Sequence, residues 1–230
     1  MRYLLMCTVV FLSLTSSYGQ GFFNTEKIRN KDNMDKQRWS WGYFLGFNSY
    51  GFDLQYNKPA TDIVVKNDIG FNVGLLGNLR INDYIDLRLE PGVVFANRTF
   101  TYTEIPEDNF RDIKSTYIHV PLLVKFSTKR LNNFKPFVVG GVSRSINLSS
   151  NETNPDDNSA GEFRMINDAN YFELGFGIDF YLPYFKFTPS IRGVFGMTDE
   201  LKRDKDPNSP YTGQIESMKS RGIFINFTFQ

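Results

Sequence analysis

The chain has 230 residues, enough for one β domain of ordinary size. Its formal net charge of +1 argues against a nucleic-acid partner, which would require a basic surface. Aromatic residues make up 16% of the chain, yet the mean hydropathy is slightly polar at −0.34. Alternating strands produce that combination, whereas a helical membrane protein would not.

Residues 1–19 have the features of a secretory signal peptide. Arg2 gives a weakly basic start, Leu4–Leu14 is an apolar core, and Ser17–Gly19 supplies the small-residue cleavage signal. The apolar core is too short to span a membrane as a helix, which takes about 20 residues. We therefore expect cleavage before Gln20 and an exported protein.

Cys7 is the only cysteine and lies within this segment. A lipoprotein signal would place its cysteine at the end of the apolar run, so we expect no lipid anchor. The mature chain would then lack disulfides, thiolate metal sites and a cysteine nucleophile. No later stretch approaches about 18 uninterrupted apolar residues. If the mature protein enters a membrane, it does so as β-structure.

Residues 20–38 form a polar, charged leader with too few apolar side chains to build a core. We expect a periplasmic tail or short helix outside the folded domain, and a partner-binding role stays open on composition alone. The folded domain is expected to span 39–230. Its first strand is predicted over 39–49, where Trp41, Tyr43, Leu45 and Phe47 alternate with glycine and asparagine.

The stretch 69–96 predicts a β-hairpin of two long arms, strands two and three, around an Asn82-Asp83 turn. One face of the hairpin is wholly apolar and includes Phe71, Val73, Leu87 and Leu89. The opposite face carries small, polar and charged residues. A soluble barrel would turn the apolar face inward, whereas a membrane barrel would turn it toward lipid, so the hairpin alone allows both.

Five further strands show the same alternation. They are predicted over 116–127, 136–146, 170–182, 185–197 and 219–230. The facing of 136–146 is ambiguous, because Phe137 and Val139 are as apolar as Val138 and Val142 on the other parity.

The connections between strands alternate in length. Long polar stretches cover 50–68, 97–115, 147–169 and 198–218, whereas the intervening turns are short. Outer-membrane barrels have long external loops and short periplasmic turns, a rhythm that soluble lipocalin-like barrels do not keep. We therefore predict an all-β fold, a closed antiparallel transmembrane β-barrel of about eight strands. Its expected location is the outer membrane of a Gram-negative, Bacteroidetes-like cell.

Three sets of residues follow from this prediction. Charged residues on the inner face are expected to form a salt-bridged lumen cluster, because buried charges need partners; they are Arg80, Asp86, Arg88, Glu90, Lys125, Arg144, Glu173, Asp179 and Arg192. Aromatic residues near strand ends are expected to form the interfacial girdle; they are Trp39, Trp41, Tyr84, Tyr181 and Tyr184. The last strand resembles the C-terminal strand signal of outer-membrane proteins through Ile225, Phe227 and Phe229, although Gln230 follows the last aromatic.

The sequence offers little for catalysis. His119 is the only histidine, so a triad or a histidine metal site has at most one candidate member. We expect it to be a hydrogen-bonded lumen side chain. Gly140-Gly141, Gly175 and Gly177 do not open a helix after a strand, as a phosphate loop would require. We expect no catalytic residue, cofactor or metal, and eight strands enclose little beyond their own side chains.

Several segments resemble the Bacteroidetes outer-membrane β-barrel superfamily; they are 70–75, 87–92, 117–125 and 135–141. A narrower likeness lies in Asp35–Asn48, which resembles the start of the first strand in PorT-like proteins, also called SprT. That family is associated with the type IX secretion system and, in gliding species, with motility. The resemblance implies a non-enzymatic outer-membrane component needed to export other proteins, and it supplies no catalytic residues to transfer.

The leading functional hypothesis is therefore a barrel that serves type IX secretion through its external loops or its leader. The alternatives are a small-solute or ion-conducting outer-membrane barrel and a soluble secreted ligand-binding barrel; an outer-membrane enzyme ranks last. The expected partners are outer-membrane lipid, the barrel-assembly machinery during insertion and other secretion-system proteins.

Overall fold

The structure is a computed structural model, and it describes residues 29–31, 33–57, 63–102, 110–156, 163–206, 209 and 211–230. The predicted signal peptide and the first half of the leader lie outside the described residues. No helix in the described ranges is long and apolar enough to cross a membrane. In the described part of the leader, one 3₁₀ turn forms, η1 (Met34–Lys36).

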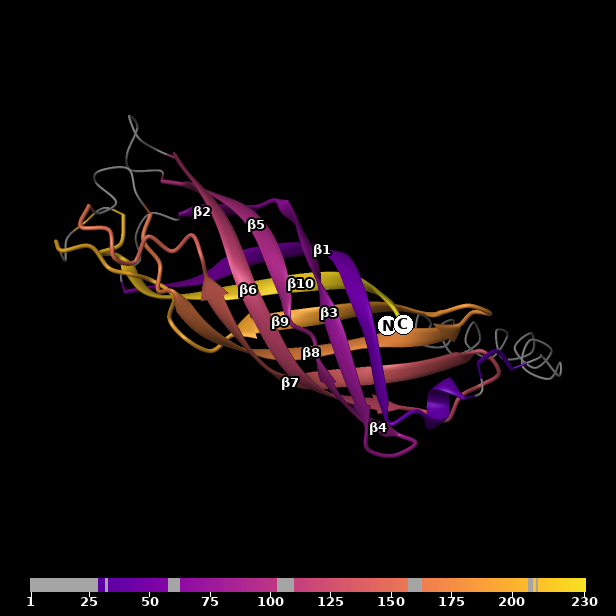
Figure 1. Cartoon of the computed structure of the whole chain (residues 1–230). Coiled ribbons are helices and arrows are strands. Elements are labelled where there is room, and N and C mark those ends of the chain that lie inside the picture. Colours follow the sequence, from indigo (N-terminus) through magenta and orange to yellow (C-terminus); the bar gives the residue numbers. More distant parts are fainter. Residues whose placement is uncertain are drawn as a thin grey trace, which may run out of the picture.

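Ten strands of the described chain form one antiparallel sheet that closes on itself (Figure 1). They are β1 (Trp39–Tyr56), β2 (Val64–Asn67), β3 (Ile69–Arg80), β4 (Ile85–Leu89), β5 (Gly92–Thr101), β6 (Phe110–Ser127), β7 (Phe134–Asn147), β8 (Asp168–Tyr181), β9 (Lys186–Gly196) and β10 (Ile215–Phe229).

The ring has eight members. Only Asp68 separates β2 from β3, and only Glu90 and Pro91 separate β4 from β5, so each pair makes one continuous element of the wall. The first and last strands pair from Tyr43 opposite Phe229 upward, which closes the ring, and β1 also pairs with β3. The prediction of a closed antiparallel barrel of about eight strands is confirmed.

The wall is apolar outside and polar inside. On β8, Leu174 is 57% exposed while the neighbouring Glu173 is fully buried. The same alternation runs through β1, β6 and β10, because successive side chains of a strand point to opposite faces. A soluble barrel would bury the apolar face, since water penalises large exposed apolar patches. This wall suits lipid instead.

The strands extend further at one end than the sequence predicts, because the two faces exchange their chemistry there. Beyond Ser49 on β1, Phe52 and Leu54 turn inward while Asp53 and Gln55 turn outward. The sequence prediction followed one apolar face and ended the strand where that face became polar. Figure 1 places these extensions, with β2, at the end opposite η1.

The ambiguous strand, β7, is resolved by burial. Phe137 and Val139 are buried inside the barrel, whereas Val138 and Val142 are exposed on the outer wall. The even-numbered residues of β7 therefore face outward.

The outward face of β8 gives a test of lipid contact. Phe176→Arg should lower the free energy of unfolding by about 2–4 kcal/mol, because it places a cation on the lipid-facing wall near mid-membrane. The measurement is denaturant unfolding in phospholipid vesicles. The control is Asn170→Arg, at the polar end of the same outward face; equal losses in both variants would contradict a lipid-facing wall.

Candidate functional site

The interior of the barrel is the candidate site, and a chain of ion pairs crosses its middle. Arg192 of β9 lies between two carboxylates, with 2.8 Å from its Nη1 to Glu90 Oε2 and 2.9 Å from its Nε to Glu173 Oε2. Arg88 Nη2 lies 3.2 Å from the other oxygen of Glu90. His119 Nε2 lies 2.7 Å from Glu173 Oε1. All five side chains are buried, so each charge is offset by a neighbour.

A second ion pair lies nearer the short-turn end. Lys125 Nζ is 2.5 Å from Asp179 Oδ2, and Thr188 donates a 2.8 Å hydrogen bond to the other oxygen of Asp179. The Lys125 ammonium also lies 4.2 Å from the centroid of the Phe137 ring. Both charges are buried, so this pair fills the lumen below the ion pairs around Arg192.

The leader docks against the barrel at the mouth next to the short turns. Tyr181 donates a 2.6 Å hydrogen bond to Asp35 Oδ1, and Arg130 donates a 3.0 Å bond to Asp35 Oδ2. The Arg130 guanidinium carbon lies 3.8 Å from the centroid of the Tyr181 ring, and the same arginine donates to the carbonyl of Asn30. The backbone N–H of Asn30 donates a 2.9 Å hydrogen bond to Asn133 Oδ1. We call these five residues the leader latch.

Toward the loop end, a buried arginine fills the lumen. Arg98 donates from Nε to the Tyr50 carbonyl (2.7 Å) and from Nη1 to the Tyr117 hydroxyl (2.9 Å). Its guanidinium carbon lies 4.1 Å from the centroid of the Phe52 ring, within range of a cation–π contact. A backbone carbonyl, a hydroxyl and aromatic rings thus surround this cation.

Glu200 lies beside these rings. It belongs to the connection between β9 and β10, outside the membrane-spanning strands, and accepts bonds from the hydroxyls of Tyr171 (3.2 Å) and Ser220 (2.9 Å). Burial raises the pKa of Glu200, although its hydrogen bonds to Ser220 and the charge of Arg98 oppose that shift.

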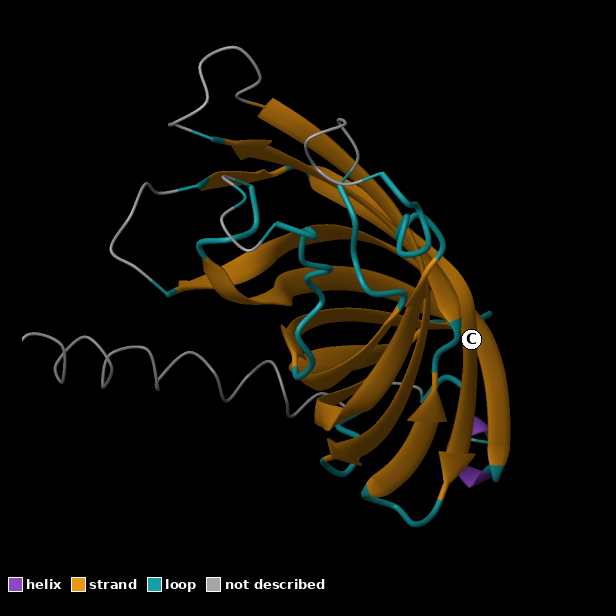
Figure 2. Cartoon of the chain, turned by 90° about the vertical axis from the view of Figure 1, so that its left-hand side faces the viewer, coloured by secondary structure: helices purple, strands orange, loops and turns teal. Residues whose placement is uncertain are grey.

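An apolar cap covers the loop end of the interior. Its buried members come from the extended strands and from the connections; they are Phe100, Tyr102, Ile113, Phe163, Met165, Leu201, Tyr211, Ile215 and Met218. Figure 2 views this end and shows the loops lying across the barrel opening. The cap is an ordinary hydrophobic core that buries apolar side chains, whereas the wall below it exposes them and buries polar ones.

Seven of the nine residues predicted for the lumen cluster are buried inside the barrel; they are Asp86, Arg88, Glu90, Lys125, Glu173, Asp179 and Arg192. Two predictions are wrong. Arg80 pairs with Asp83 at the exposed turn, because it is the last residue of β3. Arg144 lies on the outer face and pairs with Asp168 there, because the even-numbered residues of β7 face outward.

Trp39, Trp41, Tyr84 and Tyr184 are exposed near the short-turn end, as a girdle would require. The girdle prediction is wrong for Tyr181. It is 3% exposed and points inward, because it shares the parity of Glu173 and Asp179 and binds Asp35.

The last strand turns its predicted signal residues to the outer wall. Ile225 is exposed, and Phe227 and Phe229 pack against Phe187 of β9, with ring centroids 6.1 and 5.3 Å apart. Their role as an assembly signal stays a prediction.

Sequence reasoning missed Arg98, Glu200 and the leader latch. Arg98 shares the inward parity of Val94 and Ala96, so continuing the alternation past Ala96 would have found it. No local pattern signals Asp35 or Glu200, whose partners are distant in sequence. Within the described residues, no group of histidine, cysteine, aspartate and glutamate side chains is arranged to hold a metal.

The central ion pairs predict a contrast between two carboxylate–arginine contacts. Glu173→Ala leaves Arg192 with one carboxylate fewer inside the lumen and should lower the free energy of unfolding by about 3–5 kcal/mol. Arg144→Ala breaks the exposed outer pair and should change it little. Denaturant unfolding in lipid vesicles measures both; similar losses would mean that the buried network does not stabilise the barrel.

The leader latch predicts a local effect. Asp35→Ala removes the acceptor shared by Arg130 and Tyr181, so amide hydrogen exchange in residues 29–38 should accelerate while the strands keep their protection. Lys36→Ala, at the exposed neighbouring position, is the matched control. Unchanged exchange in the Asp35 variant would show that these contacts do not hold the leader.

The family of outer membrane protein beta-barrel domains matches residues 23–202 of this chain. No curated protein matches it. Among solved structures, the outer membrane protein OprG from Pseudomonas aeruginosa is 15% identical, with coverage of 82% of this chain and 95% of that one and a TM-score of 0.42. The outer membrane protein AlkL, solved in lipid bilayers, is 14% identical, with coverage of 90% and 94% and a TM-score of 0.44. Neisserial surface protein A is 10% identical, with coverage of 84% and 98% and a TM-score of 0.41.

The family match extends over most of the chain and agrees with the closed ring, the apolar outer wall and the charged interior. The protein belongs to the family of outer membrane protein beta-barrel domains, and its place is the outer membrane.

Proposed function

We propose that the protein is a non-enzymatic, non-conducting outer-membrane barrel that serves protein export by the type IX secretion system, and gliding motility where present, through contacts with partner proteins. The observation that carries the proposal is the filled interior. The leader latch, the ion pairs around Arg192, the buried Arg98 and the apolar cap follow one another from mouth to mouth. A lumen filled in this way offers solutes no path. The protein therefore acts through the surfaces that it exposes to partner proteins.

The link to secretion is supported by the likeness of Asp35–Asn48 to PorT-like proteins. This segment does two things in the barrel. Asp35 belongs to the leader latch, and Trp39 and Trp41 stack on the outer wall with ring centroids 6.4 Å apart. Trp41 lies against Gly77, where an added Cβ would come 2.9 Å from its ring. The segment thus presents two aromatic rings beside the periplasmic mouth, where a partner in the membrane or periplasm can reach them.

A deletion strain tests the role. Loss of the gene should abolish export of type IX substrates, and the wild-type chain should restore it. Trp41→Ala should restore export only in part, because it removes the exposed ring from the segment that carries the likeness. Tyr184→Ala, which removes another exposed aromatic at the same end of the barrel, should restore it fully. Export is measured as substrate in the culture medium, and heat-modifiability on gels confirms that each variant is folded in the outer membrane.

Undiminished export in the deletion strain would remove the secretion role. The filled lumen is checked separately with the purified barrel in planar bilayers, where no stable conductance steps are expected. Steps that change when Arg88 and Glu90 are replaced would instead support the conducting alternative.

A further inference from the structure

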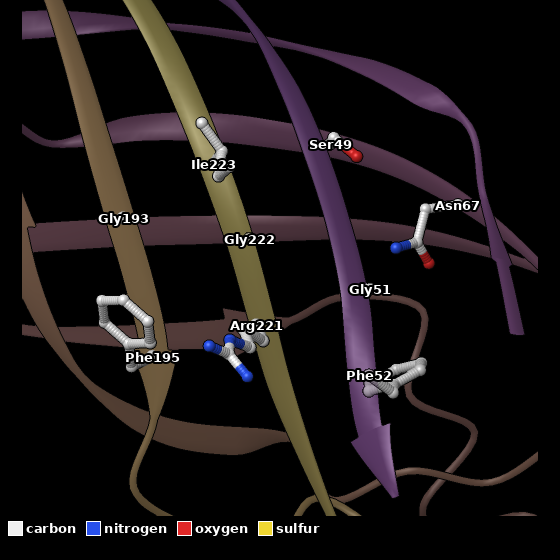
Figure 3. Close-up of a pocket in the computed structure, with 9 residues that line it drawn as sticks. All are labelled: Ser49, Gly51, Phe52, Asn67, Gly193, Phe195, Arg221, Gly222 and Ile223. Carbon is white, nitrogen blue, oxygen red and sulfur yellow. The ribbon is translucent and has the colours of Figure 1, made fainter. Parts of the chain in front are cut away.

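The outer wall has a hollow of about 380 Å³ across β1, β9 and β10, with the end of β2 beside it (Figure 3). It is lined by Ser49, Gly51, Phe52, Asn67, Gly193, Phe195, Arg221, Gly222 and Ile223. A volume of about 300 to 1,000 Å³ is typical of small-molecule sites. The hollow is therefore large enough for part of a ligand rather than for a single water molecule.

The hollow exists because glycine interrupts the outward face. Gly193 occupies an outward position of β9 between Ile191 and Phe195, both of which are exposed. A Cβ at Gly193 would lie 3.0 Å from the ring of Phe195, so any side chain there would crowd the hollow. Ile223 of β10 is paired opposite Gly193 and is exposed on the same face. The floor and the side toward mid-membrane are thus apolar.

The hollow lies where the outer wall changes from apolar to polar on the loop side. On β1 the exposed Phe47 is followed on the same face by Ser49, Gly51 and Asp53. Gly51 is 12 residues beyond Trp39, which corresponds to roughly 30 Å along the membrane normal for a tilted strand. An apolar band about 25 Å tall ends below that height. The hollow is therefore level with the headgroups of the external leaflet.

A cation stands at the polar edge of the hollow. The side chain of Arg221 is 65% exposed, and its guanidinium carbon lies 5.7 Å from the centroid of the Phe195 ring. Figure 3 shows the two side chains next to each other. Asp53 Oδ2 is 3.8 Å from Arg221 Nη1, and Lys219 lies opposite Asp53 in the strand register. Two cations against one carboxylate leave a net positive charge, and an exposed pair at that distance binds the arginine only weakly.

We propose that this hollow binds a phosphorylated lipid of the external leaflet. The phosphate is held by the planar guanidinium of Arg221, which is suited to phosphate oxygens. One acyl chain lies over Gly193 and along Ile223 into the apolar wall. The positive edge suits an anionic group, the floor of the hollow is apolar, and the hollow is level with the lipid headgroups. These three features together favour a membrane lipid over a soluble ligand. The site is independent of the proposed role in secretion.

The test uses the full-length barrel in neutral-detergent micelles, with lipid A as the probe and dephosphorylated lipid A as its match. Native mass spectrometry measures the fraction of barrel that carries lipid. Wild type should retain the phosphorylated form in preference to the dephosphorylated one. Arg221→Gln should lower retention of the phosphorylated form by about tenfold, the scale of one charge-assisted contact.

Gly193→Leu is a second variant that keeps the arginine and fills the hollow, and it should weaken retention of both lipids. Lys114→Gln, which removes an exposed outward cation from β6, is the matched control and should bind as wild type. Heat-modifiability establishes that each variant is folded. Two results would overturn the proposal. One is that the Arg221→Gln variant retains as much phosphorylated lipid A as the wild type; the other is that the wild type retains the two lipids equally.

Discussion

Closure of the backbone hydrogen bonds is the constraint on which this structure depends. Hydrocarbon offers no partner for an amide or a carbonyl, so every strand edge within the membrane must be paired. The antiparallel pairing of β1 with β10, from Tyr43 to Tyr56, removes the last free edge. With eight wall elements the ring is narrow, and its interior is about as wide as its side chains. The filled lumen follows from the closure.

The interior chemistry follows from the same closure. The outward face must be apolar where it meets lipid, so along that part of the wall the charged side chains point to the inside, where water is scarce. Arg192 is tolerated there because Glu90 and Glu173 lie on either side of it, and Lys125 because Asp179 is in contact. Arg98 has a different solution, with aromatic rings and hydroxyls in place of a carboxylate. Each of these three cations therefore has its partners on other elements of the wall.

Much of this could be predicted, because two-residue periodicity determines which side chains share a face. The parity of the hairpin and of β8 placed Arg88, Glu90 and Glu173 together inside. The prediction for Arg144 is wrong because both faces of β7 are apolar, so two-residue periodicity could not distinguish its inward face from its outward face. The prediction for Tyr181 is wrong because this residue lies at a strand end, where a girdle is expected, but has the inward parity of Glu173 and Asp179. The leader latch could not be predicted, since Asp35 meets a residue 95 positions away.

The strands continue beyond the point where their outward face stops being apolar. On β1 this point is Ser49, beyond which the outward side chains are polar and the inward ones apolar, and this has a mechanical consequence. Below it the barrel suits hydrocarbon, and above it the outward side chains, such as Asp53 and Gln55, suit water, while the buried ones form a core. Neither part can move into the other's solvent without a large loss of free energy. The boundary between the two parts therefore fixes the position of the barrel along the membrane normal. It also fixes the depth of every outward side chain in the bilayer.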